Sequence, residues 1–76
     1  MNPRVCAVEP LDNLRLRLSF LDGRVAVFDA APLLDFPAYR CLLDPALFAS
    51  ARLSHGTVEW PGGLDIDPDT LYLDSH

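Results

Sequence analysis

The sequence predicts an α+β domain in which a small antiparallel sheet is covered by short helices. Two segments, residues 14–29 and residues 51–60, carry the alternation and the turn residues of β-hairpins. Between them, residues 30–50 change to helical spacing and contain repeated prolines. A chain of 76 residues, 50% of them hydrophobic, can build one core. We therefore expect a single domain over residues 1–76.

The first strand is expected over about residues 4–9, with Pro10 as its end. Proline cannot donate to a strand ladder, so this strand suits the edge of a sheet rather than its centre. The free edge from Val5 to Glu9 could pair with its symmetry mate. The sequence therefore allows a homodimer and leaves the oligomeric state open.

A hairpin is expected over about residues 14–21 and 24–29. The first of these segments alternates strictly between apolar and polar side chains, as in a half-buried strand. Asp22-Gly23 is a favoured pair for a two-residue type I′ turn. That turn fixes the pairs as Phe20 with Val25, Leu18 with Val27, Leu16 with Asp29 and, on the other face, Arg17 with Phe28.

Short helices are expected from about residue 30 to residue 50. The prolines in this segment exclude one long helix and favour two or three short ones. Asp44-Pro45 has the form of an N-cap followed by proline at the first helical position. Asp67-Pro68 repeats the arrangement, so a last helical turn is expected near residues 68–73.

A second hairpin is expected over about residues 51–55 and 57–60, with His55-Gly56 as its loop. Histidine tolerates the left-handed backbone conformation better than most side chains. Facing residues then match in character, apolar opposite apolar and cation opposite anion. The predicted pairs are Ser54 with Thr57, Leu53 with Val58, Arg52 with Glu59 and Ala51 with Trp60.

The charge of the chain is distributed unevenly. There are 6 basic and 11 acidic residues, a formal net charge of −5. No basic residue follows Arg52, whereas the later residues include Glu59, Asp65, Asp67, Asp69 and Asp74. This acidic end keeps small domains soluble, and it is also a surface on which a basic protein partner could dock. Direct binding of nucleic acid is not expected, because it requires a concentrated basic surface.

No segment has the roughly 20 apolar residues of a membrane span, and no signal-like run begins the chain. A cytoplasmic protein is expected, with Cys6 and Cys41 as structural thiols in a reducing compartment. His55 lies at a turn tip, where a catalytic side chain would be poorly positioned. We expect neither an enzyme nor a cofactor.

The densest group of charges is the alternating series Asp65, Asp67 and Asp69. It resembles the start of a calcium loop, but Thr70 replaces the turn glycine and His76 replaces the final glutamate. No metal is therefore expected. Each aspartate instead has a local structural role, in which Asp67 caps the last helix, Asp69 lies in its first turn, and Asp65 accepts from nearby donors.

Trp60 precedes Pro61 and two glycines, which force the chain to reverse. The tryptophan either fills the core or anchors an interface, and the face that it shares with Leu53 and Val58 favours the core. The candidate partner-binding residues are Asp65, Asp67, Asp69 and Trp60.

Several motifs occur in an order that resembles a small bacterial family catalogued as domain of unknown function 2442. The most specific part is the tryptophan followed by Asp-Ile and Pro-Asp-x-Leu-Tyr. The resemblance covers nearly the whole chain. The matching residues are Leu16, Leu18, Phe20, Asp22-Gly23, Phe28-Asp29, Phe48, His55-Gly56, Trp60-Pro61, Gly63, Asp65-Ile66, Pro68-Asp69 and Leu71-Tyr72.

The resemblance implies an α+β domain without established catalytic residues. Some members carry an additional helix-turn-helix domain, and others are encoded beside a second small protein, an arrangement that suggests toxin-antitoxin-like pairs. This sequence contains no helix-turn-helix. We therefore expect a non-enzymatic interaction module, as the acidic neutralising member of such a pair. The alternative is a regulatory domain acting with a DNA-binding protein.

Overall fold

The computed structural model describes residues 2–76 and confirms an α+β fold. It contains two antiparallel sheets of three strands each, ordered β1-β2-β3 and β4-β5-β6. The predicted strands are thus divided between two sheets rather than joined in one. The strands are β1 (Val5–Leu11), β2 (Arg15–Phe20), β3 (Val25–Asp29), β4 (Arg52–Ser54), β5 (Thr57–Trp60) and β6 (Leu64–Asp65).

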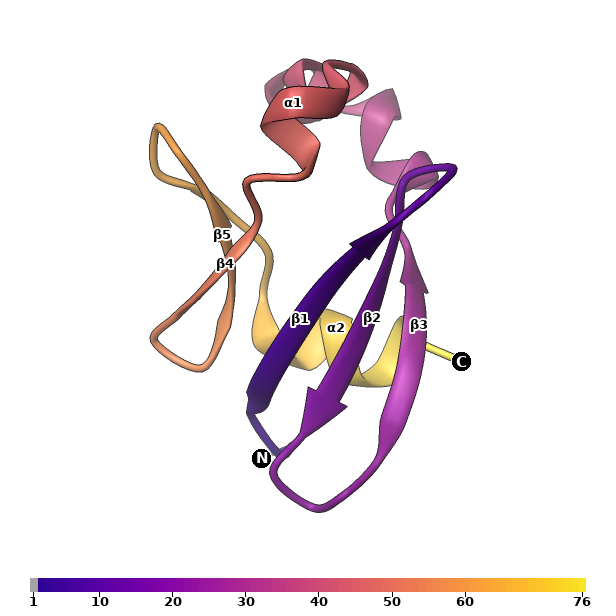
Figure 1. The fold of residues 1–76 in the computed structure, drawn as a ribbon, viewed down its shortest axis with the longest axis vertical. Coiled ribbons are helices and arrows are strands. Elements are labelled where there is room, and N and C mark those ends of the chain that lie inside the picture. Colours follow the sequence, from indigo (N-terminus) through magenta and orange to yellow (C-terminus); the bar gives the residue numbers. More distant parts are fainter. Residues whose placement is uncertain (1) are drawn as a thin grey trace.

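The helices cover one face and one end of the larger sheet (Figure 1). They are the 3₁₀ helices η1 (Ala31–Asp35) and η2 (Pro37–Leu43) and the α-helices α1 (Pro45–Phe48) and α2 (Pro68–Asp74). In Figure 1, α2 crosses the sheet, whereas the helices from residues 31–48 lie beyond its end and the β4–β5 hairpin lies beside β1. The backbone N–H of Val5 donates to the carbonyl of Gly56 at 3.1 Å and joins the two sheets.

The β2–β3 hairpin differs from its predicted register by one residue. Its loop has three residues, from Leu21 to Gly23, instead of the expected two. The Phe20 N–H donates to the Arg24 carbonyl at 2.8 Å, so Phe20 faces Arg24. Gly23, with a φ of 91°, provides the left-handed residue that ends such a loop. The core face of β3 therefore carries Ala26 and Phe28 in place of Val25 and Val27. Leu18 faces Ala26, Leu16 faces Phe28 and Arg17 faces Val27.

Strand β1 continues through Pro10 to Leu11, beyond its predicted end. Pro10 pairs with Leu16 and is tolerated because β1 is the edge strand of its sheet. A register shift lies between Val5 and Ala7, and β1 also contacts the β4–β5 hairpin. Homodimer formation through this edge stays a prediction.

The β4–β5 hairpin has the predicted register. Ser54 pairs with Thr57, Leu53 with Val58 and Arg52 with Glu59. His55 and Gly56 have φ angles of 53° and 78°, as a type I′ turn requires. Strand β6 was not predicted, because Leu64–Asp65 is too short to show alternation.

Proline occupies the first turn of every helix in the described part of the chain. The three prolines of residues 30–50 thus give three short helices, as expected. Asp44 caps α1 by accepting from the Ala46 N–H at 3.0 Å, and Asp67 caps α2 by accepting from the Thr70 N–H at 3.2 Å. Both predicted caps are confirmed.

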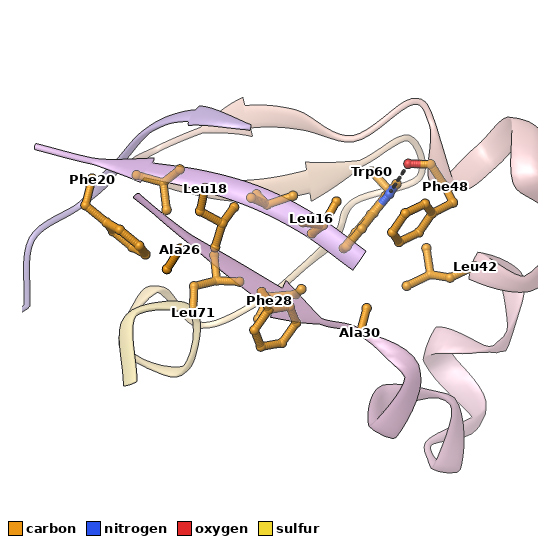
Figure 2. Close-up of a cluster of buried hydrophobic side chains, with 13 residues drawn as sticks. Leu16, Leu18, Phe20, Ala26, Phe28, Ala30, Leu42, Phe48, Trp60 and Leu71 are labelled. Atoms are coloured by element: carbon orange, nitrogen blue, oxygen red, sulfur yellow. Dashed lines mark hydrogen bonds between the residues drawn. The ribbon is translucent and has the colours of Figure 1, made fainter. Parts of the chain in front are cut away.

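One hydrophobic core joins the two sheets and the helices (Figure 2). Leu16 and Leu18 of β2 are completely buried, and Leu71 of α2 points toward them across the space below the sheet. At the other end of the core, the indole N–H of Trp60 donates to the Phe48 carbonyl at 3.1 Å. This bond satisfies the one polar atom of the tryptophan side chain inside the core.

The C-terminal end of α2 is held by Arg24. Its guanidinium donates to the carbonyls of Tyr72 and Ser75, each at 2.6 Å, and lies 4.7 Å from the centre of the Tyr72 ring. Tyr72 packs edge-on against Phe20, with 4.9 Å between the ring centroids. Val27 and His76 exchange both backbone hydrogen bonds, so the described C-terminal residues also cover part of the outer edge of β3.

Hydrogen bonds at this contact shift two pKa values in opposite directions. The backbone N–H of Arg24 and then the Tyr72 hydroxyl, which donates at 2.8 Å, hold the pKa of Asp22 below its ordinary value. The same bond to Asp22 raises the pKa of Tyr72. The ionised carboxylate and the neutral phenol are therefore the forms that the folded state favours.

Substitutions at His55 test the type I′ turn. His55→Asn is expected to raise the free energy of unfolding by about 0.5 kcal/mol, because asparagine is a preferred residue for this turn. His55→Ala is expected to lower it by about 1 kcal/mol, because alanine resists the left-handed conformation. Urea unfolding of the three proteins measures both changes. An alanine variant as stable as the original would contradict the turn assignment.

The Asp22–Tyr72 bond predicts a change in acid stability. Because the folded-state pKa of Asp22 is lowered, its stabilisation is present above about pH 4 and is lost as the pH falls through the folded-state value. Tyr72→Phe should raise the pKa of Asp22 toward its ordinary value and reduce this acid-dependent loss. Carboxyl NMR titration and acid unfolding measure the two effects. Tyr39→Phe is the matched control, and an Asp22 pKa unchanged by Tyr72→Phe would refute the coupling.

Candidate functional site

Trp60 belongs to the core and is removed from the candidate partner-binding set. Its side chain is 0% exposed and packs near Phe48, with 6.0 Å between the ring centroids. A residue without accessible surface cannot anchor a partner on the folded protein. The core interpretation of the sequence is thus the one that the structure supports.

The three candidate aspartates all lie at the surface. Asp65, Asp67 and Asp69 are exposed, and none forms a salt bridge with another residue of the described chain. The ion pairs within residues 2–76 are Arg17 with Glu9 at 2.8 Å and Arg52 with Glu59 at 3.1 Å. Within residues 2–76, the acidic residues after Glu59 therefore form no salt bridge.

The aspartates do not form one cluster. Asp69 receives a hydrogen bond from the Asn2 side chain at 3.3 Å, whereas Asp67 turns its carboxylate to the first turn of α2. Asp67, Thr70 and Asp74 follow one another at spacings of three and four residues, which places them on one side of the helix. This side faces η1.

A groove runs between η1 and α2. It consists of two adjoining hollows of about 420 and 450 Å³ that share Pro32, Leu33, Thr70 and Asp74. Apolar side chains form most of its lining, and three carboxylates, those of Asp29, Asp67 and Asp74, belong to it as well. The other lining residues are Phe28, Asp29, Leu73 and His76 in one hollow and Phe36, Tyr39, Ile66 and Asp67 in the other.

Tyr39 connects this groove to Asp65. Its hydroxyl donates to the Asp65 carbonyl at 2.7 Å, which ties η2 to β6. Burial first, and then the nearby Asp65 carboxylate, raise the pKa of Tyr39. Both causes disfavour a phenolate, so Tyr39 acts here as a neutral hydrogen-bond donor.

A separate hollow of about 360 Å³ lies between the β1–β2 turn and the end of η2. Its lining is mainly apolar and includes Leu14, Leu42 and Phe48, with Asp12 as its acidic member. Leu14 has a φ of 61°, a rare conformation for a bulky residue, and its carbonyl accepts from the Ala30 N–H at 2.8 Å. These contacts give the strained residue a structural role.

No group of three or more metal-ligating side chains is found among residues 2–76. Cys6 and Cys41 are both free thiols within that range, but they are exposed, so neither has the buried structural role that was expected. His55 lies at the hairpin tip, with its ring nitrogen 3.0 Å from the Ser54 hydroxyl. In the part of the chain that the structure describes, no helix has the length and hydrophobicity needed to span a membrane.

The sequence reasoning placed Asp74 in the acidic end but not among the candidate partner-binding residues, and it missed the apolar groove residues. Asp74 ends α2, where the negative end of the helix dipole opposes a carboxylate. That unfavourable position is a sequence signal, because it gives the residue no stabilising role in its own helix. Phe36 gives no comparable signal, since nothing in the sequence shows that 60% of its surface stays exposed.

The fold and the groove define a small α+β domain. Its acidic side consists of the exposed carboxylates of Asp65, Asp67, Asp69 and Asp74, next to the apolar groove. The chain belongs to the family described as "Protein of unknown function (DUF2442)", whose model matches residues 5–76. This match confirms the resemblance inferred from the order of the motifs. No curated protein and no solved structure matches the chain.

Substitutions at Asp67 separate its role as a cap from its charge. Asp67→Asn is expected to change the free energy of unfolding by less than about 0.5 kcal/mol, because asparagine caps as well as aspartate. Asp67→Ala is expected to lower it by about 1 kcal/mol. Urea unfolding compares the two variants. Asp69→Asn is the control, because it removes a charge from the first turn of α2 and leaves the Asp67 cap in place. Equal losses in the asparagine and alanine variants would show that the charge of Asp67, and not its capping hydrogen bond, contributes to the free energy of unfolding.

Proposed function

We propose that this protein is a non-enzymatic interaction module whose acidic side binds a basic protein partner. The observation that carries the proposal is the set of exposed carboxylates from residue 65 onward without a salt bridge in the described chain. Their potential is available to a partner because none of them is paired in a salt bridge among residues 2–76. Charge complementarity of this kind accelerates association and favours a partner whose surface is positively charged.

The placement of the arginines supports binding over solubility alone. Arg17 and Arg52 pair with glutamates, and Arg24 binds carbonyl oxygens at the end of α2. A surface serving solubility alone benefits from mixed charges of both signs. Here no arginine or lysine follows Arg52, and the later aspartates, two of which line the apolar groove, form no salt bridge within residues 2–76.

Within this function, we assign the protein the role of the acidic neutralising member of a bacterial toxin-antitoxin-like pair. A small acidic domain can block a basic toxin by covering its cationic surface, which requires no catalytic step. The resemblance to a family with members encoded beside a second small protein supports this role. The physical requirement is a stable complex whose affinity depends on ionic strength.

Native co-purification tests the proposal. The tagged full chain should retain a basic protein at about 0.05 M salt and lose most of it at about 0.5 M, because salt screens exposed charges. Mass spectrometry identifies the partner. A double variant, Asp65→Asn with Asp69→Asn, should retain less of it.

The control for this experiment is Glu9→Gln with Asp12→Asn, which makes the same change in net charge at β1 and its turn. It should retain the partner like the original protein. Recovery of free protein at both salt concentrations would overturn the proposed function. Equal losses in the two double variants would show that net charge, and not the acidic side, governs retention.

A further inference from the structure

We propose that the groove between η1 and α2 binds an amphipathic, basic segment of the partner protein. An apolar side chain of that segment would enter the hollow beside Leu33, and its cations would meet Asp67 and Asp74. The inference rests on the proposed function and specifies which surface and which partner chemistry serve it.

The lining of the groove supplies the apolar part of this recognition. Ile66 and Phe28 are buried at its floor, and Leu33 is half-buried along its length. At its rim, Phe36 is 60% exposed and Leu73 is 66% exposed. Large apolar side chains held open beside a hollow offer contact area that the domain itself does not use.

The charges of the groove identify its occupant. Asp29, Asp67 and Asp74 line it together with one histidine, His76, and no arginine does so among residues 2–76. Asp29 and Asp67 accept backbone N–H bonds from Ala31 and Thr70, at 3.0 and 3.2 Å, which fix their carboxylates without neutralising them. An acidic or phosphate-rich ligand would be repelled. A segment carrying lysine or arginine is complementary to this rim.

The spacing of the carboxylates defines the spacing of the cations. Asp67 and Asp74 are seven residues apart along α2, which corresponds to about 10 Å along the helix axis. A helical partner segment meets this distance with cations at positions i and i+7. Apolar residues at i+3 and i+4 then lie on the same face, between the cations.

A designed peptide tests this geometry with the full chain. The probe is an alanine-based helix of about 16 residues, with arginines at i and i+7 and leucines at i+3 and i+4. Its scrambled control has the same composition but places the arginines and leucines on different faces. Fluorescence anisotropy should give at least about tenfold tighter binding of the ordered peptide. Equal binding of the two peptides, or no binding of either, would overturn the inference.

Two pairs of variants locate the binding. Asp74→Asn and Phe36→Ser should each weaken the ordered peptide at least about threefold. Their controls are Asp12→Asn, an exposed carboxylate at the β1–β2 turn, and Leu43→Ser, which removes an apolar residue that is 63% exposed; both lie outside this groove. Urea unfolding confirms that each variant folds. Equal effects of groove variants and controls would refute the assignment to this groove.

The co-purified partner separates this inference from the proposed function. Loss of the partner from Phe36→Ser and its retention by Leu43→Ser would support the groove. Equal retention by the two variants, with loss from Asp65→Asn plus Asp69→Asn, would overturn the groove while the acidic interaction stands. Absence of any partner would remove the proposed function itself.

Discussion

The position of α2 depends on the contact between its last turn and Arg24. A helix of seven residues is not stable by itself in water, so tertiary contacts must hold it. Leu71 enters the core, Asp67 caps the first turn, and the Arg24 guanidinium binds the carbonyls of Tyr72 and Ser75. Those carbonyls are among the groups that a helix end leaves without intrahelical partners. Because α2 forms one wall of the groove, the same contact positions Thr70 and Asp74.

The same contact helps to separate the charges of the molecule. Arg24 binds the backbone at the end of α2 and therefore leaves Asp74 without a salt bridge in the described structure. Arg17 and Arg52 pair with glutamates on the two sheets. These three cations are thus bound to other groups, while Asp65, Asp67, Asp69 and Asp74 remain exposed. The acidic side is a product of the tertiary structure as well as of the uneven sequence.

The two hairpins show what the sequence could and could not determine. His55-Gly56 joins strands whose facing residues match in charge and character, and its predicted register is correct. Asp22-Gly23 is compatible with loops of two or three residues, and Val25 and Val27 made the shorter loop look better suited to the core. The longer loop is favoured because Arg24 then faces Phe20 and reaches Tyr72, which is 48 residues away. A contact between residues so far apart in the sequence cannot be predicted from local sequence patterns. The groove has the same origin, since it joins Leu33 to Thr70 across the chain.

Some residues have a conformation, charge or exposure that is unfavourable in their local structure. Such residues indicate which parts of this domain have a role besides stabilising the fold. Leu14 adopts a left-handed conformation, but its carbonyl bonds to Ala30 and its side chain packs against the core, so the fold explains it. Asp74 opposes the dipole of its own helix, and Phe36 leaves most of a large apolar side chain in water. Asp74 forms no salt bridge among residues 2–76. Sequences tend to be consistent across levels except at functional sites. Both departures lie at one groove, which supports the proposal that this groove binds a partner.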